Sequence, residues 1–177
     1  MLKRLVLTVT GRDRVGIVDD VTKVVLSYQG NVESSRMARL GGEFAMLMLI
    51  SAPEAQFDSL QDGLRALKEQ GFDLVSRPTE HNVSQKFAGW STYQLQVRGA
   101  DHEGIIHQIT HHLAQEGVSI ETMDTGTEDA PFGGTVLFSM TATVVAPPES
   151  SFASLQEALA DIGHELQVDT EIARVSG

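Results

Sequence analysis

The sequence predicts an α+β fold built from two copies of one small β-α-β-β-α-β unit. The first observation is an internal repeat: residues 11–17 read Gly-Arg-Asp-Arg-Val-Gly-Ile, and residues 99–105 read Gly-Ala-Asp-His-Glu-Gly-Ile. The offset of 88 positions holds without a gap from about residue 5 to residue 34 of the first copy. The second observation is that strand and helix periodicities follow in the same order in both copies. A repeat of this length indicates two copies of one domain.

Apolar spacing predicts the first strand and the first helix of each copy. Leu5, Leu7 and Val9 recur at every second position, as Tyr93, Leu95 and Val97 do in the second copy, which is typical of half-buried strands. After the glycine turn, apolar residues recur at helical spacing: Val18, Val21 and Val25, and then Ile106, Ile109 and Leu113. Glycines are expected to end both helices, near Gly30 and Gly117.

The remaining elements are also predicted twice. A Gly41-Gly42 pair between apolar runs indicates a hairpin, repeated as Gly133-Gly134 after a longer loop through residues 128–131. A second helix is predicted from two apolar stripes that share an offset of 95 positions: Phe57, Leu60, Leu64 and Leu67, and Phe152, Leu155, Leu159 and Ile162. The last strands are expected at about residues 72–77 and 166–175.

Each half is therefore predicted to be ferredoxin-like, with an antiparallel sheet that carries its helices on one face. The domains are expected at residues 1–80 and 91–177, joined by a polar linker over residues 81–90. The third strand of the first copy, residues 44–50, is apolar on both faces. An antiparallel strand with one face in water should alternate. We therefore expect a partner on its second face, either the other half or a second chain.

The composition argues against several classes of protein. The net charge is −11, with 13 basic residues scattered among 24 acidic ones, whereas nucleic-acid binding depends on clustered Lys and Arg. Direct nucleic-acid binding is not expected, and a role in gene regulation would act through another protein. Without cysteine there are no disulfides and no thiolate chemistry. No apolar run reaches the roughly 18 residues of a membrane span, and a signal-peptide pattern is lacking, so we expect a cytoplasmic protein that binds no membrane.

The turn between the first strand and the first helix is the candidate ligand site. Residues 11–16 read Gly-x-Asp-x-x-Gly, and residues 99–104 repeat the motif. The start of a helix presents unpaired N–H groups and the positive end of a dipole, which suit a small anion such as a carboxylate. Glycine also lets the backbone approach a ligand. The alternative is a structural role, in which Asp13 caps the helix and the glycines form a tight turn.

Metal and catalytic sites are not expected. His107 and His111 stand four positions apart on a predicted helix, a spacing that can bind zinc, but the first copy has Asp19 and Lys23 there and no third ligand is evident. The sequence contains no nucleophile elbow and no phosphate-binding loop that ends in Lys. We therefore predict a protein that is not an enzyme and holds no metal or cofactor. The methionines are expected in the core or at an interface: Met37, Met46, Met48 and Met123.

The strand, the Gly-x-Asp-x-x-Gly-Ile turn, the helix and the tripeptide that follows resemble the ACT domain, a regulatory module that binds small molecules. That tripeptide is Asn31-Val32-Glu33 in one copy and Ser119-Ile120-Glu121 in the other. The resemblance covers nearly the whole chain, twice. The stretch over residues 33–44, Glu-Ser-Ser-Arg-Met-Ala-Arg-Leu-Gly-Gly-Glu-Phe, further resembles the tandem-ACT proteins known as glycine cleavage system transcriptional repressors.

The resemblance implies that a ligand, usually an amino acid such as glycine, lies between this turn of one domain and the second strand of a neighbouring domain. It places the first turn opposite Ser119 and Ile120, and the second opposite Asn31 and Val32. The turn residues are Asp13, Arg14, Val15, Gly16 and Ile17 in one copy, and Asp101, His102, Glu103, Gly104 and Ile105 in the other. An amino acid would offer its carboxylate to the helix N–H groups and its ammonium to strand carbonyls or the Asn31 side chain. Glu103 would repel a carboxylate, which favours the first turn.

Three functions are compatible with these observations. The leading hypothesis is a non-enzymatic sensor that binds an amino acid and changes its association with a regulatory protein, such as a transcription factor, or with a second copy in a homodimer. The second is a protein-interaction module without a ligand, in which the glycine turns are only structural. The third is a detached regulatory subunit of an amino-acid metabolic enzyme.

Overall fold

The computed structural model describes residues 1–79, 87–131 and 133–175. The chain divides into two compact units, residues 1–83 and 84–177. The first unit contains β1 (Leu2–Arg12), α1 (Ile17–Ser27), β2 (Asn31–Leu40), β3 (Glu43–Pro53), α2 (Glu54–Ala66), the 3₁₀ helix η1 (Leu67–Gln70) and β4 (Asp73–Thr79). The second contains β5 (Ser91–Ala100), α4 (Ile105–Gln115), β6 (Ser119–Asp129), β7 (Val136–Ala146), α5 (Phe152–Leu166) and β8 (Val168–Arg174). Both units show the predicted β-α-β-β-α-β order.

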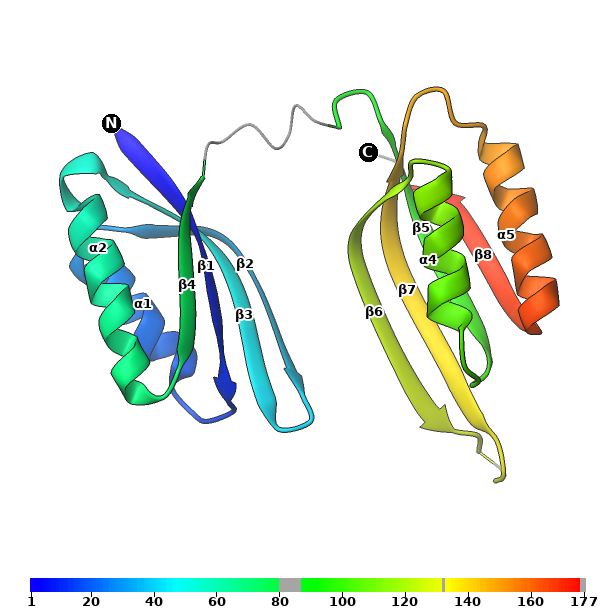
Figure 1. Cartoon of the computed structure of the whole chain (residues 1–177), viewed down its shortest axis with the longest axis horizontal. Helices are drawn as coiled ribbons and strands as arrows, with labels where there is room; N and C mark the ends of the chain where they lie inside the picture. Colours follow the sequence, from blue (N-terminus) through cyan, green and yellow to red (C-terminus); the bar gives the residue numbers. More distant parts are fainter. Residues whose placement is uncertain (80–86, 132, 176–177) are drawn as a thin grey trace. The chain divides into compact units, whose positions relative to one another are not determined.

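Each unit folds around one four-stranded antiparallel sheet. The strand order is β2-β3-β1-β4 in the first unit and β6-β7-β5-β8 in the second. In each unit both helices lie on one face of the sheet, α1 and α2 in the first and α4 and α5 in the second (Figure 1). The predicted α+β, ferredoxin-like fold is confirmed for both copies.

The first helix of each unit buries a slightly different stripe from the one predicted. Ile17, Val21 and Val25 are buried in α1, whereas Val18 is 36% exposed. In α4 the stripe likewise begins at Ile105, and Ile106 is 38% exposed. Positions 17, 21 and 25 are each four apart and share one helix face, which points at the sheet. The apolar spacing in the sequence, counted from Val18 and Ile106, thus begins one position after the buried face of each helix.

The second helices differ between the units at their beginnings. Phe57 and Leu60 of α2 are buried, as predicted. Phe152, the expected counterpart of Phe57, is the first residue of α5 and is 37% exposed. Its ring stacks on that of Tyr93, with 5.3 Å between the centroids. Leu155 and Leu159 are buried, so the predicted stripe of α5 is correct except at its start.

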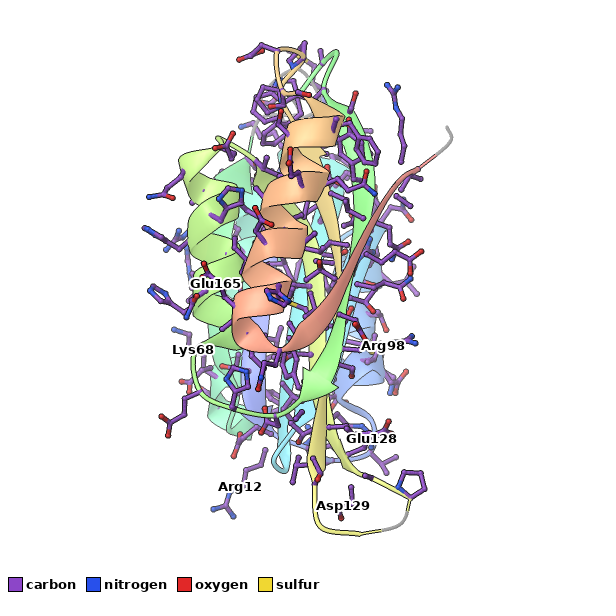
Figure 2. All side chains as sticks on the ribbon, turned by 90° about the vertical axis from the view of Figure 1, so that its right-hand side faces the viewer. Arg12, Lys68, Arg98, Glu128, Asp129 and Glu165 are labelled. Carbon is purple, nitrogen blue, oxygen red and sulfur yellow. The ribbon has the colours of Figure 1, made fainter. Side chains whose placement is uncertain are left out.

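The two hairpins turn differently. Gly41 and Gly42 both have positive φ, 59° and 86°, which suits a two-residue hairpin turn. In the second unit β6 continues through Glu128 and Asp129, which pair with Leu137 and Val136. The predicted loop over residues 128–131 was therefore wrong in its first half, and Figure 2 shows both acidic side chains near the tip of the hairpin.

The segment between the units is only partly described. Strand β4 reaches Thr79, and β5 begins at Ser91, where the second domain was predicted to start. Residues 87–90 form a turn in which the Trp90 N–H donates to the Phe87 carbonyl at 3.1 Å. Most of the predicted linker, residues 81–86, lies outside the described residues.

The sheet face opposite the helices is open within the first unit. On β3 the side chains that point toward the helices are buried, including Met46 and Met48, whereas Leu47 is 48% exposed on the opposite face. Val75 of β4 is 51% exposed, and both it and Leu47 pair with Thr8 of β1, one from each side. The expected partner for this second face is not part of the unit, so it stays a prediction. Of the other methionines, Met37 and Met123 are exposed.

Candidate functional site

The two glycines of the repeated motif have different structural roles. Gly16 and Gly104 are the N-cap residues of α1 and α4, with φ of 95° and 93°. Residues other than glycine rarely adopt this left-handed conformation. Gly99 provides space instead, because a Cβ there would lie 2.6 Å from Cγ1 of Val168. The backbone conformation of the turn therefore requires glycine at the N-cap in both units.

Asp13 does not cap the helix. The N-cap of α1 is Gly16, which has no side chain to accept from the first-turn N–H groups, and the first helical bond runs from the Asp20 N–H to the Gly16 carbonyl at 2.9 Å. The Asp13 N–H donates to the Gly42 carbonyl at 3.1 Å, and its carboxylate accepts from Arg39 at 3.2 Å. The capping role considered for Asp13 is therefore wrong. Among the described residues no side chain caps the start of α1, an arrangement that suits an anion.

The acidic side chains in the first turn of α1 are both paired. Asp20 accepts from Arg14 at 2.7 Å, and Asp19 forms an ion pair with Lys23 at 2.5 Å. The Arg14 guanidinium also lies 4.9 Å from the centroid of the ring of Phe72, the residue just before β4. These pairs offset the negative charge that would otherwise repel an anion at the helix N-terminus.

A pocket of about 560 Å³ lies beside this turn in the first unit. One side is formed by the turn and the first residues of α1, and the other by the second half of β2 and the start of β3. Its lining residues include Asp13, Arg14, Gly16 and Ile17, all predicted from the sequence. It also includes residues that were not predicted: Val18, Asp19, Met37, Ala38, Arg39 and Phe44.

The second unit's turn is organised around His102. Its Nε2 lies 2.7 Å from the carbonyl oxygen of Leu166, and its Nδ1 lies 3.0 Å from that of Glu103. These two acceptors, that of Leu166 first, raise the pKa of His102 above its ordinary value, and the negative charge of Asp101 adds to the effect. As in the first unit, the aspartate N–H is bound to the hairpin, here to the Val136 carbonyl at 2.8 Å.

The predicted residues on the second strands lie away from these turns within their own units. Asn31 and Val32 begin β2, whereas the pocket is lined by residues 37–39 near its end. Ser119 and Ile120 likewise begin β6. Their predicted role requires a neighbouring domain, so the pairing of turns and strands stays a prediction. Val15 is 99% exposed and does not line the pocket.

The pocket residues on β2 and β3 were not predicted, because strand register decides where they lie. Spacing along the chain does not reveal that register. Gly11 pairs with Phe44 across β1 and β3, and Phe44 pairs with Arg39 across β3 and β2. This register brings the hairpin end of β2 beside the turn at Asp13. The sequence did contain one signal for Arg39. This residue stands just before the Gly41-Gly42 turn, in a hairpin that must return beside the first strand.

His107 and His111 of α4 are exposed, and the neighbouring His112 is half-buried. The rings of His107 and His111 stack with their centroids 5.7 Å apart. Among the residues that the structure describes, no three or more His, Asp or Glu side chains gather to hold a metal ion. Within the same residues, no helix is both long enough and apolar enough to cross a membrane.

Comparisons with known proteins agree with this architecture. The family model of the ACT domain matches residues 3–76, most of the first unit. The chain is 27% identical to the glycine cleavage system transcriptional repressor of Escherichia coli (strain K12) over 95% of this chain and 88% of that protein. It is also 44% identical to a UPF0237 protein of Methanosarcina mazei over 48% of this chain and 91% of that protein.

Two crystal structures share the fold over the full length. An unknown protein from Galdieria sulphuraria is 35% identical, with a TM-score of 0.83 over 99% of this chain and 100% of that one. A protein provisionally assigned as a glycine cleavage system transcriptional repressor is 22% identical, with a TM-score of 0.71 over 100% and 99% of the two chains. The first unit thus contains an ACT domain, the second unit repeats its fold, and the chain as a whole is related to the glycine cleavage system transcriptional repressors.

Proposed function

We propose that this protein is a non-catalytic sensor that binds a free α-amino acid at the β1–α1 turn of its first unit and thereby changes its association with a partner protein. The observation that carries the proposal is the pocket between the uncapped start of α1 and the Asp13–Arg39 pair. The pocket combines groups for both charges of an amino acid. Helix N–H groups and guanidinium suit the carboxylate, and the Asp13 carboxylate suits the ammonium.

The regulatory part of the proposal is supported by the similarity of the chain to regulatory proteins. The relatives that match along nearly the whole chain are named as transcriptional repressors. With a net charge of −11, this chain is poorly suited to bind DNA itself. A role in transcription would therefore depend on another protein, whose affinity changes when the amino acid stabilises one conformation or assembly.

A thermal-shift screen of the full chain against the twenty amino acids tests the proposal. A ligand at about 100 times its Kd stabilises the folded state by about 2.7 kcal/mol, which raises the Tm by several degrees. Asp13→Asn should abolish the shift, because it removes the charge that faces the ammonium. The matched control is Asp101→Asn, the same change in the second turn, which should leave the shift intact. A flat screen, or a shift unaffected by Asp13→Asn, would overturn the proposal.

A ligand-free interaction module is the second candidate. The exposed Leu47 and Val75 on the open face of the first sheet favour it, because clustered exposed apolar side chains often mark protein contacts. The same screen separates the two candidates, since this one expects no amino acid to raise the Tm.

A further inference from the structure

Two exposed apolar side chains line the first-unit pocket. Val18 of α1 and Met37 of β2, at 36% and 54% exposure, together form its apolar wall. Removing such surface from water stabilises a complex in proportion to the area covered. A ligand that lies only against the charged groups would leave this wall in water.

Two charged side chains line the same pocket, Asp13 from the turn before α1 and Arg39 from β2. Asp13 and Arg39 are joined by a hydrogen bond of 3.2 Å, and the Arg39 side chain is 73% exposed. The guanidinium can therefore move onto a carboxylate with little loss of packing. The α-carboxylate and α-ammonium of an amino acid fit this charged pair, and Met37 and Val18 of the same pocket are then available to its side chain.

The same positions in the second unit carry different side chains. Met37 pairs with Met46 on β3, and the corresponding pair in the second sheet is Thr125 with Met140. By the same register, Thr127 replaces Arg39. The second turn thus lacks both the methionine of the apolar wall and the guanidinium.

We infer that the first-unit pocket selects amino acids with apolar side chains, such as leucine and methionine, over glycine, and that the chain has one such site. This inference rests on the proposed function and adds the class of amino acid bound. The exposed surface of Val18 and Met37 supports it, since glycine has no side chain to cover this apolar surface.

Calorimetric titration of the full chain with glycine, alanine, valine, leucine and methionine tests the inference. Leucine and methionine should bind at least about tenfold more tightly than glycine, since single methylenes in an apolar pocket discriminate by this factor or more. The expected stoichiometry is one ligand per chain.

Substitutions taken from the second unit separate the contribution of the apolar wall from that of the charged pair. Met37→Thr should weaken leucine and methionine several-fold and leave glycine nearly unchanged. Arg39→Thr should weaken all the amino acids alike, because it removes a contact to their shared carboxylate. The control is Met123→Thr, which removes another exposed methionine, on β6 of the second unit, and should alter no affinity. Both first-unit side chains are exposed, and circular dichroism checks that the variants fold.

The possible outcomes distinguish the inference from the proposed function. Glycine binding as tightly as leucine, or two equal sites per chain, overturns the inference and leaves the sensor intact. Equal loss of all ligands in Met37→Thr also overturns it. Failure of every amino acid to bind overturns the proposed function, and the inference with it.

Discussion

A permanent charge in the first unit is replaced by a titratable one in the second. Arg14 and His102 occupy the same place in the repeat, and each contacts the carbonyl of the residue that follows it. Arg14 also lies over the Phe72 ring, whereas His102 bonds to the carbonyl of Leu166, the last residue of α5. A positive charge on His102 interacts favourably with the carbonyl end of that helix.

His102 should make the second unit more stable in mild acid. Its two ring nitrogens both face carbonyl oxygens, and only the imidazolium can donate from both. Because the folded-state pKa is raised, this stability is fully present below the unfolded pKa of about 6.5 and is lost as the pH rises through the folded pKa. The measurement is the urea midpoint at a series of pH values from 5.5 to 8, roughly spanning that titration.

Two variants isolate this effect from the other histidines. His102→Arg, which introduces the residue type of the first unit, should keep the link at all pH values and flatten part of the pH dependence. His107→Gln removes an exposed histidine of α4 and should leave the profile unchanged. An NMR titration in which His102 has a pKa at or below that of the exposed histidines would contradict the prediction.

At the scale of elements, glycines in the second helices allow close packing. A Cβ on Gly163 of α5 would lie 2.8 Å from the Val168 carbonyl oxygen, so the helix approaches the backbone of its own last strand. A Cβ on Gly63 of α2 would meet the ring of Tyr28, 2.5 Å from Cε2. The two contacts differ in kind, because a half-buried ring can move and a strand backbone cannot.

Gly163→Ala should destabilise the protein by about 1–3 kcal/mol, because the added methyl group is overpacked against β8. This loss is expected even though alanine has a higher helix propensity than glycine. Gly63→Ala is the matched comparison and should cost less, because the Tyr28 ring can shift toward water. Urea unfolding curves of both variants measure the difference. A Gly163→Ala protein as stable as the wild type would show that α5 can move away from β8 without loss.

At the scale of the whole molecule, each unit has its own core. The buried apolar cluster of the first unit runs from Leu5 to Leu74, and that of the second from Tyr93 to Ile172. Domains of this size can fold alone, although they bury a smaller share of their surface than larger ones. All residues that line the candidate pocket belong to the first unit.

Residues 1–83 expressed alone should therefore fold and bind the same amino acids as the full chain. The expected results are a cooperative thermal transition and Kd values within about threefold of those of the full chain, a difference below 1 kcal/mol. Calorimetry on both proteins provides the comparison. Loss of binding by a folded fragment would mean that a second domain completes the site, as the resemblance to ACT domains implied for Ser119 and Ile120.

The sequence by itself determined the doubled fold and the place of the turn. Alternation in strands, four-residue spacing in helices and glycines at the junctions are local signals, and the repeat presents each of them twice. The position of Gly16 was readable for the same reason, because a left-handed helix cap requires glycine locally.

Only the tertiary structure decided what surrounds the turn. Strand register brought Arg39 and Met37 beside Asp13, and it directed the Asp13 carboxylate to Arg39 instead of the helix. It also placed the Leu166 carbonyl beside His102. These contacts join residues that are 26 and 64 positions apart, and periodicity along the chain carries no information about such distances. They form because the β2–β3 hairpin pairs with β1 and brings Arg39 to the first turn, whereas the pairing of β8 with β5 brings the end of α5 to the second turn.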